Sequence, residues 1–215
     1  QAAWLTLFEA AFGHSMTPAF WHWKYRDTDK LGIGAWREGQ LVAFYGGMPR
    51  PILDAGKAAY AVQVGDVMVH PAERGVMTKS GVFQQIGTSF LESHLLGFGF
   101  PTARALSTAS KMGLYAGVDT LTEARWTVSR ARPSPWHSSR PVTAADAPQV
   151  EALWRAMARD LRQNIVVVRD WAYLQARYLD HPDRPYTVLL TRHRWTRQPV
   201  GLVVHPAPGH PDGTL

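Results

Sequence analysis

Apolar side chains recur along the chain with two different periods, which predict helices and strands in a mixed α/β order. Over residues 2–12 they recur every three or four positions, as on the buried face of an amphipathic helix. The same spacing returns after Thr17, a suitable N-cap, with Pro18 at the first helical position. Two shorter apolar runs, 33–37 and 41–45, predict the paired strands of a hairpin.

The stretch from Val62 to Leu96 combines a predicted strand, a cationic loop and a predicted helix. Its first eight residues, 62–69, carry the β-branched valines of a strand. From Phe83 onward the apolar residues return to helical spacing. The loop between them contains Arg74 and Lys79. Because free backbone N–H groups and the helix dipole favour anions at a helix N-terminus, this loop is suited to bind a phosphate.

The segments that flank this stretch carry weaker patterns. Prolines within residues 48–51 are expected to break the second strand of the hairpin. Downstream we expect a short strand near 103–106, a helix over about 109–115, and a strand over 121–128.

The second half of the chain follows a segment rich in Pro, Ser and Arg. We predict a linker at 131–140 between a domain at 1–130 and a further domain at 141–215. In the second domain, Thr143 to Asp146 is expected to cap a helix over 150–161. The patterns then predict, in order, a helix over 170–178 and strands over 186–191 and 200–204.

The two halves share a weak internal similarity. Phe20–Asp27 (FWHWKYRD) and Tyr173–Asp180 (YLQARYLD) both begin with an aromatic residue, carry a basic residue and Tyr at the fifth and sixth positions, and end in Asp. Each is followed by two predicted strands. We therefore interpret the second half as a partial duplication of the first, and expect the chain to be a fragment at both ends.

Composition narrows the function without deciding it. The chain has 46% hydrophobic residues and nine Trp, enough for a packed core, and no apolar run near the roughly 20 residues of a membrane helix. No signal peptide is visible and there is no Cys, which fits a cytoplasmic protein. The histidines lack a repeated ligand spacing, so no metal site is expected. A net charge of +6 suits a phosphate-bearing ligand, nucleic acid or an anionic surface.

The run VMVHPAERG, residues 67–75, resembles the fourth strand and phosphate loop of the GNAT (GCN5-related) N-acetyltransferases. Residues 2–128 would cover that α/β fold, a mixed sheet flanked by helices, except for its first strand. Residues 141–204 resemble the opening of a second copy, as in tandem GNAT proteins. The resemblance implies acetyl-CoA or another acyl-CoA as co-substrate, with no metal.

The resemblance also implies roles for individual residues. The exposed strand edge would pair with the pantetheine amides of the cofactor, and the loop amides would hold its pyrophosphate. The implied cofactor-binding residues are Val67, Met68, Val69, Arg74, Gly75, Val76, Lys79, Ser80 and Gly81. Met77 and Lys79 stand where the family has small residues. Either the loop is longer and Gly81 takes over one of those roles, which we favour, or the pyrophosphate site is degraded.

Two residues are candidates for catalysis. Tyr115 matches the tyrosine that many members of the family use as general acid toward the leaving thiolate; the alternative is a ring that only packs under the sheet. Asp66 is the only carboxylate on the central strand, and is therefore a candidate base or amine-binding group. Its alternative role is to accept hydrogen bonds from nearby backbone N–H groups.

Three functions follow from these observations. The first is an acyl-CoA-dependent N-acyltransferase that transfers an acetyl group to a primary amine of a small molecule or peptide. The second is a noncatalytic acyl-CoA-binding or regulatory module. The third, a nucleic-acid-binding protein, is suggested by charge alone, and a membrane is not expected as a partner.

Overall fold

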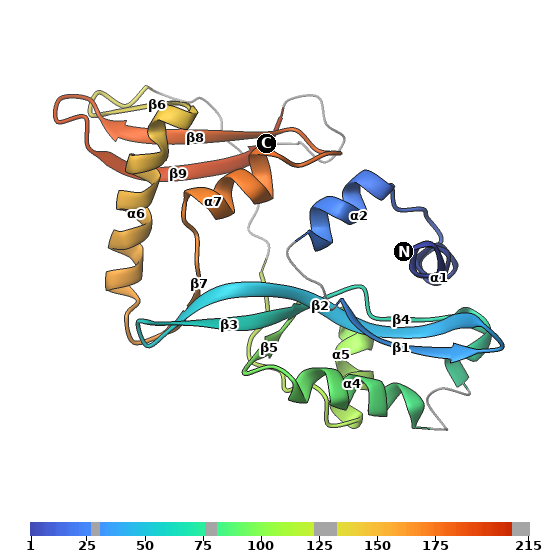
Figure 1. Cartoon of the computed structure of the whole chain (residues 1–215). Coiled ribbons are helices and arrows are strands. Elements are labelled where there is room, and N and C mark those ends of the chain that lie inside the picture. Colours follow the sequence, from blue (N-terminus) through green and yellow to red (C-terminus); the bar gives the residue numbers. More distant parts are fainter. Residues whose placement is uncertain (27–30, 76–80, 123–132, 208–215) are drawn as a thin grey trace. The chain divides into compact units, whose positions relative to one another are not determined.

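Figure 1 shows the computed structural model, which describes residues 1–26, 31–75, 81–122 and 133–207. The chain divides into two compact units. The first contains residues 1–51 and 59–120, and the second contains residues 52–58 and 121–215. The predicted mixed α/β fold is confirmed.

The elements of the first unit follow one another in the order α-α-β-β-β-β-α-β-α. They are α1 (Ala2–Phe12), α2 (Pro18–Tyr25), β1 (Gly32–Arg37), β2 (Gln40–Asp54), β3 (Lys57–Val64), β4 (Met68–Val69), α4 (Val82–Glu92), β5 (Gly97–Phe98) and α5 (Ala103–Lys111), with a 3-10 turn at Pro71–Glu73.

The two N-terminal helices form where local signals predict them. α1 has the expected bounds and ends at Gly13, whose φ of 77° is readily adopted only by glycine. α2 begins at Pro18, and the Thr17 hydroxyl accepts a hydrogen bond of 3.1 Å from the Phe20 N–H. The end of α1 and the start of α2 are therefore encoded within a few residues of sequence.

The sheet of the first unit is organised around β2. Strands lie in the order β1-β2-β3-β5, and β4 also pairs with β2. β1 and β4 run antiparallel to β2, whereas β3 and β5 run parallel to each other. Figure 1 shows α1 and α2 on one face of this sheet and α4 and α5 on the other.

The expected break of β2 at residues 48–51 is wrong. β2 continues through Pro49 and Pro51 to Asp54. β1 pairs only with residues 40–46 of β2, so both prolines lie beyond that partner. Because they are two positions apart, their missing N–H groups face the same edge of the strand, and the strand can continue.

Each face of the sheet buries its own core. Phe44 and Met48 pack with Trp4 and Phe8 beneath the N-terminal helices. Tyr45 packs on the opposite face, in a cluster of residues from β2, β3 and α4 that includes Val42, Val62, Ile86 and Phe90. β2 is thus apolar on both faces, as expected for a strand covered by two helical layers.

The predicted central strand over 62–69 is interrupted. β3 ends at Val64 and β4 begins at Met68, so Gly65, Asp66 and Val67 lie between the two strands. Asp66 has φ of 52°, a left-handed conformation that the sequence pattern does not reveal. β3 pairs with β5 at Val62↔Gly97 and Gln63↔Phe98.

The prediction for the next segment is wrong in detail. Residues 103–106, expected as a strand, form the first turns of α5, because Thr102 caps the helix and accepts a hydrogen bond from the Ala105 N–H at 3.3 Å. The helix ends at Lys111, so Tyr115 lies beyond it. Of the strand expected over 121–128, residues 121–122 are not in a strand and the rest lies outside the described residues.

The second unit contains a three-stranded antiparallel sheet in the order β6-β8-β9. Its elements are β6 (His137–Pro141), a 3-10 turn (Ala144–Asp146), α6 (Ala147–Asp160), β7 (Ile165–Val167), α7 (Trp171–Leu174) with a π-helical turn (Gln175–Leu179), β8 (Tyr186–His193) and β9 (Pro199–Pro206). Val150, Leu174 and Val188 form its core. The two helices and two strands predicted here are confirmed.

Two features bear on the predicted division of the chain. Residues 137–141 of the second half form β6, so the last part of the predicted linker is a strand. Residues 52–54, at the end of β2, pair with β7 and belong to the second unit. Residues 147–206 share the helix-helix-strand-strand order of 2–54 except for β7, which lies between the two helices, and the duplication stays a prediction.

Candidate active site

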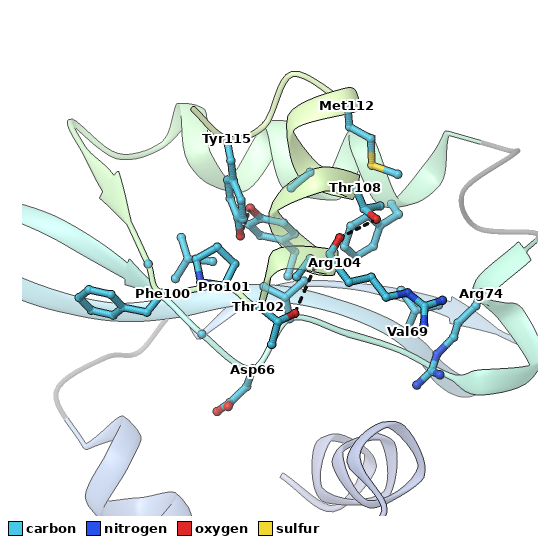
Figure 2. A pocket seen from close by; sticks show the side chains of 18 of the residues that line it. Asp66, Val69, Arg74, Phe100, Pro101, Thr102, Arg104, Thr108, Met112 and Tyr115 are labelled. Carbon is cyan, nitrogen blue, oxygen red and sulfur yellow. Dashed lines mark hydrogen bonds between the residues drawn. The ribbon is translucent and has the colours of Figure 1, made fainter. Parts of the chain in front are cut away.

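A pocket of about 910 Å³ opens in the first unit where β3 and β5 stop pairing. One wall is the interruption between β3 and β4, and the other is formed by residues 99–102 and α5. The lining residues are Phe12, Tyr45, Val64, Gly65, Asp66, Val67, Val69, Arg74, Gly75, Phe83, Gly99, Phe100, Pro101, Thr102, Arg104, Ala105, Thr108, Ala109, Met112 and Tyr115. Figure 2 shows this pocket from close by.

The pocket brings together six of the residues singled out from sequence, namely Asp66, Val67, Val69, Arg74, Gly75 and Tyr115. Met68 is instead 1% exposed and packs in the core beneath α1 and α2, because alternate residues of a strand face opposite sides. Gly81 begins α4 as its N-cap with φ of 72°. Val76, Lys79 and Ser80 lie outside the described residues.

Two arginines lie at one end of the pocket. In Figure 2 the side chains of Arg74 and Arg104 reach toward the same end, beside Val69. Arg74 comes from the turn after β4 and donates to the Ala11 carbonyl at 3.0 Å, while Arg104 comes from the first turn of α5. Two guanidinium groups from different elements form an end of the pocket suited to a phosphate.

Arg104 was not among the residues selected from sequence. The sequence pattern predicts a strand near 103–106 and places the start of the next helix at about residue 109. The signal that could have found it is Pro101-Thr102, an extended proline dipeptide whose Thr is a good N-cap.

Tyr115 lies elsewhere on the pocket wall and is paired with Tyr45. The Tyr45 hydroxyl donates to the Tyr115 hydroxyl oxygen at 2.9 Å. The Tyr45 ring is held by Phe83 and Phe90, with ring centroids 5.8 and 5.9 Å away. A Cβ on Gly87 of α4 would come within 3.0 Å of this ring, so the glycine allows the helix to approach. The position of the Tyr45 hydroxyl is therefore set by packing.

Both phenols are protonated at neutral pH, and burial raises their pKa further. Burial raises the pKa of Tyr115 above the ordinary value of 10.0, and the hydrogen bond from Tyr45 acts in the opposite direction. The pKa of Tyr45 is also raised, first by burial and then by its hydrogen bond to Tyr115. Because Tyr45 donates to Tyr115, the Tyr115 hydrogen remains available for another acceptor.

Asp66 forms a compact polar cluster with two residues of α2. Lys24 Nζ lies 2.5 Å from Asp66 Oδ2, and the Tyr25 hydroxyl donates to the same oxygen. Only 19% of the Lys24 side chain and 14% of the Asp66 side chain are exposed. Burial, followed by the charge of Asp66, raises the pKa of Tyr25, which keeps it a donor. Asp66 therefore receives side-chain donors rather than the backbone N–H groups that were considered from sequence.

The described residues contain neither a cluster of metal ligands nor a membrane-spanning helix. No three His, Asp or Glu side chains gather there as metal ligands would, and no helix there has the length and apolar character needed to cross a bilayer.

Residues 2–104 match the family model of the acetyltransferase (GNAT) domain. This match identifies residues 2–104, a little less than half of the chain, as a GNAT domain. This match covers the interruption between β3 and β4, Arg74 and the start of α5, and therefore most of the pocket walls of the GNAT domain. No curated protein sequence matches the chain.

Solved structures resemble the chain over nearly its whole length. N-myristoyltransferase of Saccharomyces cerevisiae, solved with myristoyl-CoA and inhibitors, has a TM-score of 0.57 at 11% identity over 95% of this chain and 55% of that one. An Enterococcus faecalis V583 protein described as a "Probable N-Acyltransferase" has a TM-score of 0.63 at 14% identity over 95% and 52%. These likenesses establish the fold, and the chain spans about half the length of each neighbour.

Proposed function

We propose that the GNAT domain of this chain is an acyl-CoA-dependent N-acyltransferase that transfers an acyl group, most simply acetyl, to a primary amine. The observation that carries the proposal is the pocket between the diverging strands, with two arginines at one end and the Tyr45–Tyr115 pair on its wall. The match of residues 2–104 to the GNAT domain supports it. A cytoplasmic location is part of the same proposal.

The cofactor would lie along the interruption between β3 and β4. Backbone groups near Val67 and Val69 would pair with the pantetheine amides, and the turn at Arg74 and Gly75 would receive the phosphates together with Arg104. Val76, Lys79, Ser80 and Gly81 would complete the pyrophosphate site. Met68 faces the opposite core, so its role would be limited to its backbone.

The reaction needs little beyond positioning and two proton transfers. The amine nitrogen attacks the thioester carbon, a new C–N bond forms, and the C–S bond breaks to release the CoA thiolate. Tyr115 would protonate that thiolate with the hydrogen that its bond from Tyr45 leaves available. Asp66 would accept the proton that the amine loses.

One observation favours a second function, that of a noncatalytic acyl-CoA-binding module. The Asp66 carboxylate already receives Lys24 and Tyr25 on Oδ2, and these two donors make it a weaker base toward an incoming amine. In this alternative the pocket binds acyl-CoA without turnover.

Two measurements on the full chain distinguish these functions. Isothermal titration with acetyl-CoA and with a long-chain acyl-CoA is expected to give saturable binding; the absence of heat with both would exclude enzyme and binding module alike and leave the nucleic-acid hypothesis. Release of free CoA with a panel of primary amines should then exceed the rate without amine. Binding without amine-dependent release would favour the noncatalytic module.

A further inference from the structure

The Asp66 cluster places a primary amine of the protein itself beside the candidate base. Lys24 Nζ is 2.5 Å from Asp66 Oδ2, and Asp66 lines the pocket between Gly65 and Val67. An acceptor amine would need the same position, since it must lie against a carboxylate at the pocket wall to lose its proton. The chain thus carries a group of acceptor chemistry in contact with a residue that lines its own pocket.

The local backbone holds this arrangement. Asp66 has φ of 52°, and its carboxylate oxygen also receives the Tyr25 hydroxyl. Lys24 and Tyr25 are consecutive residues at the end of α2, and the Tyr25 side chain is 3% exposed in the core. The buried ring therefore anchors the helix end that carries Lys24 and restricts where its amine can move.

We propose that Lys24 is a self-acylation site of this protein, with bound acyl-CoA as the donor. In the reaction Asp66 takes one proton from the Lys24 ammonium, and the free Nζ attacks the thioester carbon. An amide C–N bond forms as Nζ loses its second proton to water, the C–S bond breaks, and the CoA thiolate leaves and is protonated by Tyr115. The inference rests on the proposed function, because it requires the thioester to lie near Asp66.

The modification would change the pocket as well as the lysine. An acylated Lys24 has no positive charge, so its ion pair with Asp66 is lost while the Tyr25 hydrogen bond can persist. The carboxylate would then be available to an external amine. Self-acylation would thereby convert the occupied state of Asp66 into one that can accept substrate.

The test is peptide mass mapping of the full chain after incubation with acetyl-CoA. Lys57 and Lys111 are matched controls, because both are exposed whereas Lys24 is largely buried. Uncatalysed acetylation favours exposed amines. A directed reaction should acetylate Lys24 at least about tenfold faster than either control, as positioning beside a bound donor raises the effective concentration.

Variants separate the proposal from a structural ion pair. Lys24→Arg keeps the positive charge and should remove the modification at this position alone. Asp66→Asn should lower Lys24 acetylation to the rate of Lys57, and Tyr25→Phe, which keeps the carboxylate, should retain it at more than the control rate. Circular dichroism of each variant checks that it is folded.

Titration with acetyl-CoA distinguishes the two possible failures. If acetyl-CoA binds but Lys24 is acetylated no faster than Lys57 and Lys111, self-acylation is overturned and the proposed function stands. If acetyl-CoA does not bind, both are overturned. Preferential acetylation of Lys24 that Asp66→Asn leaves unchanged would show that Asp66 is not the base.

Discussion

Asp66 in the first unit and Asp146 in the second are both enclosed carboxylates that pair with cations, yet their surroundings differ. Asp146 is 1% exposed and receives both terminal nitrogens of Arg140, at 2.8 and 2.6 Å. It also pairs with Arg192, and accepts from the Thr143 N–H at 2.9 Å in a capping box at the start of α6. Asp66 receives two donors on one oxygen and borders a pocket.

The difference separates a structural carboxylate from one available for chemistry. Both oxygens of Asp146 are bonded, and its donors come from β6, β8 and the helix start, so it joins three elements of the second unit. The donors of Asp66 are a lysine and a tyrosine of a single helix, and the residue is one of those that line a cavity. We therefore expect substitutions at Asp146 to change stability and substitutions around the pocket to change binding and rate.

The largest expected effect is that of Asp146→Asn on the second unit. The substitution leaves the buried Arg192 guanidinium without its counter-charge, which should cost about 3–5 kcal/mol. Hydrogen exchange of the β8 amides in increasing urea measures this loss of unfolding free energy in the second unit. Asp160→Asn, at the exposed end of α6, is the control and should stay within about 0.5 kcal/mol.

The same substitution should leave the affinity for acetyl-CoA unchanged, because every lining residue of the pocket belongs to the first unit. If Asp146→Asn lowers the free energy of unfolding of the second unit by less than about 1 kcal/mol, the ion pairs of Asp146 are balanced by the cost of burying them.

Lowering the pH should remove the stabilisation that Asp146 gives to the second unit. Its pKa is lowered in the folded protein, chiefly by the hydrogen bonds from Arg140, so its stabilisation is present above the unfolded carboxyl pKa of about 4. It is lost as the pH falls toward the lower folded value. The stability of the β8 amides should therefore decline below about pH 4. Asp146→Asn should flatten that decline, and an unchanged slope would assign it to other carboxyls.

Local signals predicted α1, α2 and the start of α6, and non-local contacts account for the missed interruption at Asp66. Thr17, and Thr143 with Asp146, were read correctly as helix starts because a cap acts within three residues. The interruption at Asp66 was not predicted, since its left-handed backbone is held by contacts with α2, more than 40 residues earlier in the chain.

In the candidate site too, some residues could be selected from local sequence and others could not. Four residues of the resembling run 67–75, and Tyr115, line the pocket. Tyr45 could not be selected, because its hydrogen bond joins residues 70 apart in sequence. Arg104 was missed through a misplaced helix start, an error of local interpretation, since Thr102 was a usable cap signal.

Tyr115→Phe tests the pocket side of the comparison. Removing the hydroxyl should slow CoA release in the presence of amine by about 100-fold, the lower range for a general acid, with little change in the affinity for acetyl-CoA. Tyr60→Phe is a matched control, because Tyr60 is 67% exposed on β3 and is not among the lining residues. Equal rates for Tyr115→Phe and the control would remove Tyr115 as the acid.

Arg104→Gln should weaken acetyl-CoA binding by about tenfold, which corresponds to the loss of one charge-assisted hydrogen bond. Calorimetry of acetyl-CoA and of a pantetheine thioester without phosphates makes the test specific, since the second ligand should bind both proteins equally. Lys111→Gln, at the exposed other end of α5, removes the same charge away from the pocket. An equal effect of both variants would indicate general attraction by positive charge.

The smallest expected effect belongs to Tyr45→Phe, which removes the donor to Tyr115 without removing the acid. The bond from Tyr45 lowers the pKa of Tyr115, so its loss should raise that pKa further and make Tyr115 a weaker acid. We expect CoA release to slow by about fivefold, near the 1 kcal/mol of one hydrogen bond, with unchanged acetyl-CoA affinity. Because the acid form is the active one, the alkaline decline of the rate should move to higher pH. NMR titration of ring-labelled tyrosine measures the same shift without turnover. A Tyr115 pKa that stays unchanged or falls would mean that the Tyr45 hydroxyl serves packing alone, and Tyr115 would then act without support from that hydroxyl.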